Sequence, residues 1–208
     1  MSVMLPVFSI ARHRLVTDGQ GVTTLVGAYG CPLQCRYCIN PHAWRPSTLE
    51  KCMRLTPEQL YDKVKIDNLY FLSTGGGVTF GGGESLLHAA FIAAFRQVCG
   101  PDWRLTVETS LHVPPENLEQ VLEAADHFIV DIKDLDREVY ASYTGQPQDP
   151  LEENLRRLAA CLPPDRVQIR IPRIPGYNTE ENIRKSLDKL KRMGFTRLEV
   201  FHYILQKS

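Results

Sequence analysis

The chain has 208 residues, of which 43% are hydrophobic and 23% are charged, and this balance fits one globular domain with a sizeable core. Basic and acidic residues number 24 each, so the sequence lacks the basic field expected of a nucleic-acid-binding protein. No run approaches the ~18 apolar residues of a membrane span, and the amino-terminal apolar stretch is too short for a secretory signal. We therefore expect a cytoplasmic protein, in which clustered cysteines stay reduced and bind metal or take part in chemistry.

Apolar, β-branched runs alternate with amphipathic segments from residue 23 onward. The apolar runs predict six strands, at residues 23–28, 77–80, 105–108, 128–131, 167–171 and 198–202. Helices are predicted at residues 85–98, 115–125, 149–162 and 179–193, and another starts near Thr56. Thr179 caps the last of these helices and Gly194 follows it, while Pro150 stands at the first helical position of the helix before.

Strands and helices that alternate at this spacing form right-handed βαβ units around a parallel sheet. Six such units are too few for the closed eight-stranded TIM barrel of roughly 250 residues. We therefore predict an α/β fold in the form of an incomplete, open (β/α)6 barrel, that is, a partial TIM barrel. In folds of this kind the active site lies at the carboxyl ends of the parallel strands.

Three of the six cysteines, Cys31, Cys35 and Cys38, lie in the stretch YGCPLQCRYCIN, directly after the first predicted strand. A structural zinc site or a cluster bound by cysteines alone needs a fourth protein ligand, and neither Cys52 nor His42 completes a familiar spacing. Three thiolates can instead bind three irons of a cubane and leave the fourth iron open to a substrate. The alternative is a set of reduced thiols or a structural zinc site.

The other three cysteines carry no comparable pattern. Cys99 and Cys161 continue the apolar faces of two predicted helices, and a buried free cysteine behaves as a small hydrophobic residue. Cys52 has no partner motif. We interpret all three as structural residues.

The stretch STGGGVTFGGGESLL, residues 73–87, places glycines on both sides of a predicted strand. Glycines let the backbone approach a ligand closely, and a helix is predicted to begin at Ser85. The pattern is neither a P-loop nor a dinucleotide-binding turn. Taken alone, it fits a tight strand-to-helix turn equally well.

Polar residues also end the later strands, in VETS (residues 107–110) and VDIKD (residues 130–134). Asp131 and Lys133 fall at the predicted active-site end, although an aspartate after an apolar run is often only a turn residue. Arg170 interrupts the apolar run QIRIPRIPGYN. A buried arginine without an anion is costly, so Arg170 is expected to face the site and a carboxylate.

The stretch CPLQCRYC, including Tyr37 before the third cysteine, resembles the signature of the radical S-adenosylmethionine (SAM) superfamily. DGQGVTTLVGAYGCPLQCRYCIN, GGGVTFGGGE, VETS, DIK and RIPRIPGYN follow one another as in glycyl-radical-enzyme activases, the group of pyruvate formate-lyase activating enzyme. The similarity runs from about residue 16 to about residue 203.

This resemblance implies that Cys31, Cys35 and Cys38 bind a [4Fe-4S] cluster with an open iron for SAM. It implies that Gly82-Gly83-Glu84 contacts the amino group of SAM. The other implied residues of the SAM pocket are Tyr37, Thr109, Asp131, Lys133 and Arg170. A monovalent cation beside SAM would be bound at Glu108, Thr109, Ile129 and Asp131.

The sequence departs from the activase pattern at several positions. Gln20 and Thr23 replace a proline and an arginine before the first strand, Ile39 replaces a histidine after the third cysteine, and Gly81 replaces a serine. Near the end, where many relatives carry a Pro-Tyr-His motif, this chain has FHYILQKS instead. His202 could compensate for this missing motif, although a lone histidine at a strand end is more often a turn or surface residue.

The resemblance implies that the enzyme reductively cleaves SAM to a 5′-deoxyadenosyl radical, which abstracts a glycine α-hydrogen from a partner glycyl radical enzyme. About 17 residues separate Cys38 from the helix near Thr56, too few for an inserted ferredoxin-like domain. We therefore expect a single radical SAM domain over residues 1–208, a monomer that receives its electron from a flavodoxin or ferredoxin.

Two alternatives remain open from the sequence. One is a radical SAM enzyme that acts on a small molecule, a peptide or RNA. The other is a non-catalytic iron–sulfur, metal-binding or electron-transfer protein, against which the missing fourth thiolate counts.

Overall fold

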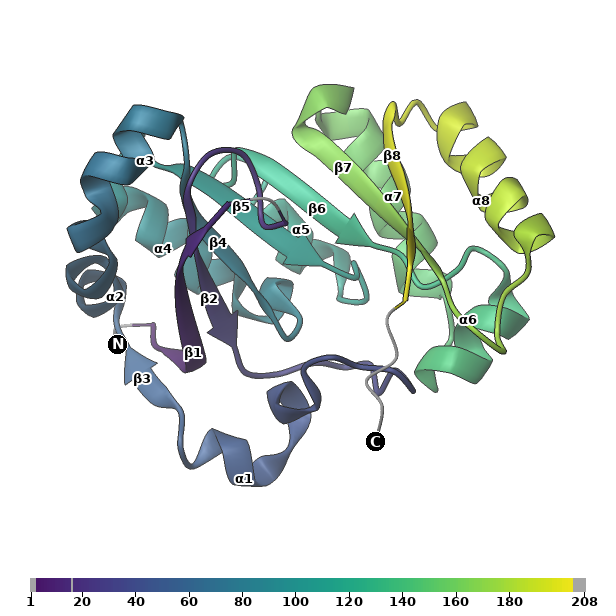
Figure 1. The fold of residues 1–208 in the computed structure, drawn as a ribbon, viewed down its shortest axis with the longest axis horizontal. Coiled ribbons are helices and arrows are strands. Elements are labelled where there is room, and N and C mark those ends of the chain that lie inside the picture. Colours follow the sequence, from purple (N-terminus) through teal and green to yellow (C-terminus); the bar gives the residue numbers. More distant parts are fainter. Residues whose placement is uncertain (1–2, 16, 204–208) are drawn as a thin grey trace.

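The computed structural model describes residues 3–15 and 17–203, and its centre is one eight-stranded sheet in the order β3-β1-β2-β4-β5-β6-β7-β8. The six strands β2 and β4 to β8 are all parallel, as the sequence predicted. The strands are β1 (Leu5–Arg14), β2 (Thr23–Ala28), β3 (Met53–Leu55), β4 (Gly77–Gly82), β5 (Arg104–Thr109), β6 (His127–Asp131), β7 (Val167–Arg173) and β8 (Arg197–His202). The sheet is curved and open, which confirms the partial barrel (Figure 1).

Two strands were not predicted. β1 pairs with β2 in antiparallel fashion, and the short strand β3 pairs with the outer side of β1. Leu5 and Val7 of β1 are buried, while the second half of the strand is largely exposed. The amino-terminal stretch therefore forms part of the sheet rather than a separate tail.

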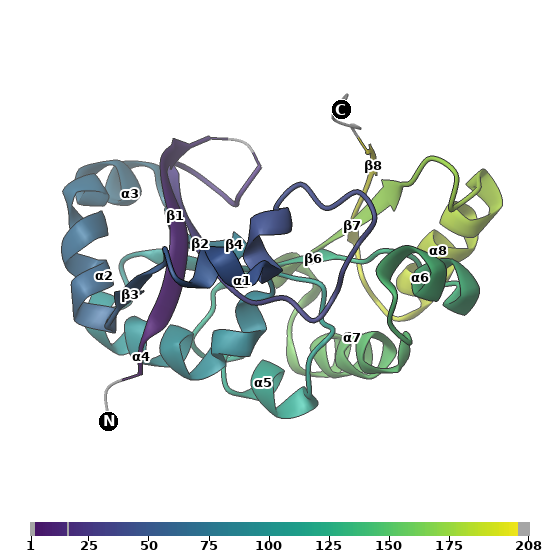
Figure 2. The same ribbon diagram turned by 90° about the horizontal axis from the view of Figure 1, so that it is seen from below.

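Helices cover the convex face of the sheet (Figure 2). The α-helices are α1 (Pro46–Leu49), α2 (Pro57–Val64), α3 (Asn68–Thr74), α4 (Ala89–Cys99), α5 (Pro115–Glu119), α6 (Arg137–Thr144), α7 (Asp149–Cys161) and α8 (Glu180–Arg192). Short 3-10 turns are η1 (Pro41–Trp44), η2 (Lys65–Asp67), η3 (Ser85–His88) and η4 (Pro164–Arg166). In the described residues, no helix is long and apolar enough to cross a membrane.

The observed helices differ from the predicted ones in several places. The segment expected as one helix at residues 85–98 is a 3-10 turn followed by α4, because the Glu84 side chain binds the backbone of Leu86 and tightens the first turn. α5 ends at Glu119 rather than near residue 125, and α6 was not predicted. α7 begins at Asp149, so Pro150 is its second residue rather than its first.

Alternate residues of the parallel strands face opposite ways. One set, including Phe80, Val107 and Val130, is fully buried in the apolar core, and Phe80 contacts the rings of Phe91 and Phe95 in α4. The other set faces the concave side and includes Thr79, Glu108, Asp131 and Arg170. The Thr79 hydroxyl donates to the carbonyl of Asp18, which belongs to the connection between β1 and β2. This connection therefore lies against the concave side of the sheet.

Candidate active site at the carboxyl ends of the strands

The loop that carries Cys31, Cys35 and Cys38 begins directly after β2, at the carboxyl end of the parallel sheet (Figure 2). All three thiols are free and half-buried. Burial raises the pKa of Cys31 to about 12, with a smaller contribution from the Glu84 carboxylate, and burial also raises the pKa of Cys35. Cys31 and Cys35 therefore need a bound metal to become thiolates near neutral pH.

The three thiols come from one loop and have the chemistry of iron ligands. Within residues 3–15 and 17–203, no three histidine, cysteine or acidic side chains converge as the ligands of one ion do. Binding of a cubane cluster with one open iron by Cys31, Cys35 and Cys38 stays a prediction.

The remaining cysteines lie apart from this loop. Cys99 is half-buried in α4 and its pKa is raised to about 11 by burial. Cys52 is half-buried, and its thiol contacts the carbonyl of Thr48. Cys161 is exposed, so the expectation that it continues the buried face of its helix was wrong, because α7 ends at this residue.

The cysteine loop is hydrogen-bonded to the Gly82-Gly83-Glu84 segment. The amides of Gly83 and Glu84 donate to the carbonyls of Ala28 at 3.1 Å and Gly30 at 2.7 Å. Asn40, beyond the third cysteine, donates from Nδ2 to the carbonyl of Gly82 at 3.3 Å. The two motifs that the sequence placed more than 40 residues apart therefore form one unit.

His88 adds a link that the sequence did not predict. Its Nε2 lies 2.6 Å from the carbonyl oxygen of Tyr29, two residues before the first cysteine. A carbonyl only accepts, so Nε2 carries the proton. No local signal distinguishes this histidine, because its partner lies 59 residues away in the chain.

The close approach of the two motifs explains the glycines. A Cβ atom on Gly83 would lie 2.2 Å from the carbonyl oxygen of Gly30 and 2.7 Å from that of Ala28. Gly82 has a φ angle of +88° and would meet the ring of Phe8 at 2.7 Å. Any side chain at residue 83 would separate the cysteine loop from the end of β4.

The Glu84 side chain is buried and accepts hydrogen bonds from within the protein. Its carboxylate receives the Ser110 amide at 2.8 Å, the Ser110 hydroxyl at 2.6 Å and the Thr109 hydroxyl at 2.5 Å, besides the Leu86 amide. Thr109 is likewise buried. Glu84 thus ties the end of β4 to the end of β5, and a contact with a ligand stays a prediction for both side chains.

Arg170 faces carboxylates on the concave side of the sheet, as its sequence context indicated. Its Nη1 lies 3.3 Å from Glu108 Oε1 and 4.0 Å from Asp131 Oδ1, and its Nε lies 3.8 Å from Glu199 Oε2. Burial, together with repulsion by Asp131, raises the pKa of Glu108 to about 8. Three carboxylates therefore lie within 4.0 Å of the Arg170 guanidinium.

Two side chains of this polar group lack hydrogen bonds within the described part of the chain. Asp131 Oδ1 is buried and accepts no hydrogen bond there, although Arg170 lies 4.0 Å away. Lys133 makes neither a hydrogen bond nor an ion pair among the same residues. Burial by itself lowers the pKa of Lys133, but Asp131, Cys35, Tyr203 and Cys31 together raise it above its usual value.

Gly81, one of the departures from the activase pattern, makes room for Glu108. A Cβ atom on Gly81 would lie 2.5 Å from Glu108 Oε2 and 2.9 Å from the side chain of Leu25. The glycine and the long acidic side chain therefore fit each other across β4 and β5.

Tyr37 belongs to a cluster of four tyrosines contributed by four different segments. Its ring lies 6.1 Å from that of Tyr143, 5.8 Å from Tyr177 and 6.2 Å from Tyr203, and its hydroxyl donates to the carbonyl of Pro175. His202 is exposed, whereas Tyr203 joins the cluster. In FHYILQKS it is thus the tyrosine that faces the cysteine loop, and residues 204–208 lie outside the described residues.

A parallel half-barrel with three free thiols in the loop after its first parallel strand is the architecture of a radical SAM core. The family model of the radical SAM superfamily matches residues 25–190, and the chain belongs to this superfamily. The superfamily implies a [4Fe-4S] cluster and SAM as cofactors.

Two named activating enzymes and one solved structure are similar to this chain over most of its length. The pyruvate formate-lyase-activating enzyme of Clostridium pasteurianum is 33% identical over 192 residues, which cover 92% of this chain and 78% of that enzyme. The (2S)-3-sulfopropanediol sulfolyase activating enzyme of Bilophila wadsworthia is 28% identical, covering 95% and 84%. A structure of Streptococcus suis SuiB bound to S-adenosylmethionine shares the fold, with a TM-score of 0.61, 14% identity and coverage of 86% of this chain and 38% of SuiB.

Proposed function

We propose that this protein is a radical SAM activase that generates a glycyl radical on a partner enzyme. The observation that carries the proposal is the cysteine loop, which is joined to a glycine-rich strand end and opens beside a polar concave face. Relatives that align with most of the chain are named as activating enzymes, which supports the same reaction class.

Cys31, Cys35 and Cys38 would hold the [4Fe-4S] cluster. When bound, the cluster supplies one electron that cleaves SAM into methionine and a 5′-deoxyadenosyl radical, which takes the glycine α-hydrogen. The protein must hold the cysteine loop rigidly and exclude water, because such a radical attacks any nearby C–H bond. The hydrogen bonds from Gly83, Glu84, His88 and Asn40 serve the first requirement.

The remaining residues would bind SAM by complementary charge. Arg170 and Lys133 supply cations for its carboxylate, while Asp131 and the backbone of Gly82, Gly83 and Glu84 supply acceptors for its ammonium. Tyr37 offers an aromatic face, and Thr109 holds Glu84 in place. Asp131 Oδ1 is buried and accepts no hydrogen bond from the described residues, which supports a ligand at this position.

A monovalent cation beside SAM is part of the proposal. Its ligands would be oxygens of Glu108, Thr109, Ile129 and Asp131, which lie on the neighbouring strands β5 and β6. The two carboxylates of Glu108 and Asp131, both within 4.0 Å of Arg170, support such a site.

We also propose the domain organisation, oligomeric state, location and electron donor of the protein. The chain acts as a single domain over residues 1–208, without an inserted ferredoxin-like domain, and as a monomer in the cytoplasm. Its electron comes from a flavodoxin or ferredoxin. Nucleic acids and membranes are not partners, in keeping with the balanced charge of 24 basic and 24 acidic residues.

The test is anaerobic reconstitution with iron and sulfide, followed by reduction with SAM and a candidate glycyl radical enzyme. We expect 5′-deoxyadenosine and a glycyl doublet in the electron paramagnetic resonance spectrum. Replacing Cys31, Cys35 or Cys38 by alanine should abolish both, whereas Cys161→Ala, at an exposed thiol, should leave both unchanged. Deoxyadenosine without the doublet would point to another substrate, and retained SAM cleavage in a cysteine variant would refute the cluster assignment.

A further inference from the structure

Four exposed basic side chains are concentrated in residues 30–55, the segment that begins with the cysteine loop and continues through α1 to β3. They are Arg36, Arg45, Lys51 and Arg54, and Glu50 is the one acidic residue of the segment. The whole chain, in contrast, has equal numbers of basic and acidic residues. The segment is therefore a local positive region on a neutral protein.

These cations also differ from most others in lacking internal partners. Among the described residues, none of the four forms an ion pair, although many other arginines do. Examples are Arg12, Arg14, Arg96, Arg157 and Arg184. Their charge is thus available to a partner molecule.

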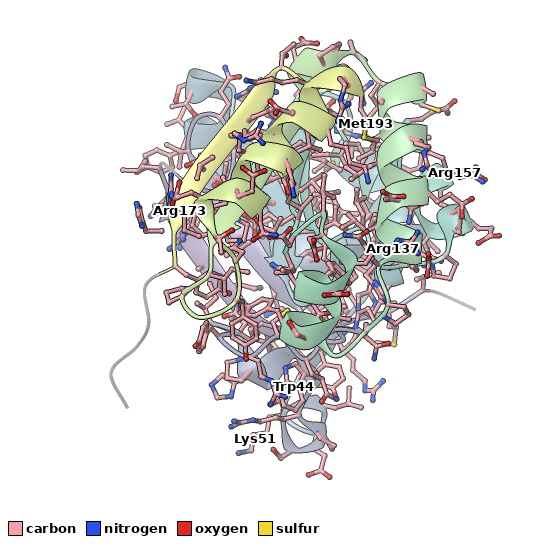
Figure 3. All side chains as sticks on the ribbon, turned by 90° about the vertical axis from the view of Figure 1, so that its right-hand side faces the viewer. Trp44, Lys51, Arg137, Arg157, Arg173 and Met193 are labelled. Carbon is pink, nitrogen blue, oxygen red and sulfur yellow. The ribbon has the colours of Figure 1, made fainter. Side chains whose placement is uncertain are left out.

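The position of the segment links this charge to the proposed cluster. Arg36 lies between the second and third cysteines, and the Gly30 amide donates to the carbonyl of Ala43, which brings residues after the loop back beside its start. Trp44 and Lys51 lie on a part of the segment that projects from the body of the molecule (Figure 3). A protein that bound here would lie next to the cysteine loop.

We propose that this positive segment, Arg36 with Arg45, Lys51 and Arg54, is the docking surface for an acidic one-electron carrier protein. The inference rests on the proposed function, which requires that an electron reach the cluster from outside. Unpaired surface charges act mainly by steering an oppositely charged partner, and steering raises association rates by roughly 10- to 1000-fold. A carrier that reaches Arg36 lies at the cysteine loop itself, because Arg36 is between Cys35 and Cys38.

The test compares two double charge reversals of equal size. Arg45→Glu/Lys51→Glu alters the segment but leaves Arg36, which lies within the cysteine loop, unchanged. Lys191→Glu/Arg192→Glu, at two exposed residues at the end of α8, is the matched control. The probe is flavodoxin of net negative charge. Its oxidised form is used for equilibrium binding, and its reduced form for stopped-flow measurement of cluster reduction, without SAM and without a partner enzyme.

We expect Arg45→Glu/Lys51→Glu to weaken binding and to slow reduction by flavodoxin at least about tenfold at low ionic strength. The difference should shrink with added salt, because the screening length falls from ~30 Å at 0.01 M to ~8 Å at 0.15 M. The control should behave like the unmodified protein. Dithionite, which needs no docking surface, should reduce the cluster of every variant at the same rate.

Equal binding and equal flavodoxin rates in the two double variants would overturn the proposal. Normal reduction by flavodoxin combined with loss of the glycyl doublet would also overturn it, and would assign the segment to the partner enzyme instead. A failure of the activase function itself would appear only in assays that contain SAM, so the two failures are distinguishable.

Discussion

At the scale of single residues, a buried histidine makes the stability of the fold depend on pH. His127, the first residue of β6, is 5% exposed and lies away from the candidate site. Burial and, secondarily, the charges of Arg197, Arg104 and Arg166 lower its pKa to about 4. The folded protein therefore holds this histidine neutral at pH values where the unfolded chain would protonate it.

This shift predicts the direction of a pH effect on stability. The contribution of neutral His127 is present above the ordinary histidine pKa of 6.5 and is lost as the pH falls toward 4, by an amount on the order of 3 kcal/mol. His127→Gln should flatten the fall in the free energy of unfolding between pH 6.5 and 4, measured by urea denaturation. An unchanged pH dependence would show that His127 is protonated in the folded state.

Gly83 shows how one missing side chain positions a whole motif. Gly83→Ala would force a methyl group into the carbonyl oxygens of Gly30 and Ala28, so we expect the cysteine loop to move and the iron content after reconstitution to fall severalfold. Gly194→Ala is the control, because its φ of +96° makes the substitution strained but no atom lies within 4 Å. Equal iron contents in the two variants would contradict the steric explanation.

At the scale of elements, local signals place helix ends well. The Asn182 amide donates to Thr179 Oγ1 at 3.3 Å, and the Thr179 amide donates to Asn182 Oδ1 at 3.0 Å, so α8 begins with a capping box. Basic side chains in its last turn suit the negative end of the helix dipole. The sequence prediction for this helix was accurate because these contacts span only three residues.

Removing this cap should affect stability but not chemistry. Thr179→Ala should lower the free energy of unfolding by about 1 kcal/mol, and Thr179→Ser, which keeps a capping hydroxyl, should recover most of the loss. Urea denaturation measures both changes, while SAM cleavage by the reconstituted variants should match that of the unmodified protein. If alanine and serine were equally destabilising, the side-chain bond would not be the stabilising contact.

At the scale of the whole molecule, the cysteine loop connects the two sides of the open barrel. It is bonded to the ends of β2 and β4 on one side, and on the other the amides of Gln34 and Arg36 donate to the carbonyls of Thr144 and Tyr143 at the end of α6, each at 3.2 Å. The tyrosine cluster joins it further to Tyr203 after β8. The loop therefore spans the mouth of the barrel (Figure 2).

Tyr143 is buried, and it contacts the cysteine loop both through its backbone carbonyl and through its ring. Tyr143→Ala should lower the free energy of unfolding by about 3–5 kcal/mol and also reduce iron incorporation, because the loop loses its support at the α6 end. Tyr143→Phe keeps the ring and should bind iron normally. Both outcomes are measured by iron analysis after reconstitution, with circular dichroism as the check on folding. Normal iron content in a folded Tyr143→Ala variant would show that the loop does not depend on this contact.

The sequence by itself was enough to predict the six parallel strands, the ends of α8 and the clustering of three cysteines after the first of these strands. Alternation, capping and ligand spacing act over only a few residues, so they can be read from the sequence. Only the tertiary structure revealed that β1 and β3 extend the sheet. It alone brought His88 to Tyr29, Gly81 to Glu108 and Tyr203 to Tyr37. The members of each of these pairs are between 27 and 166 residues apart in the chain, and no local pattern predicts which of many polar or aromatic side chains will meet once the sheet has formed.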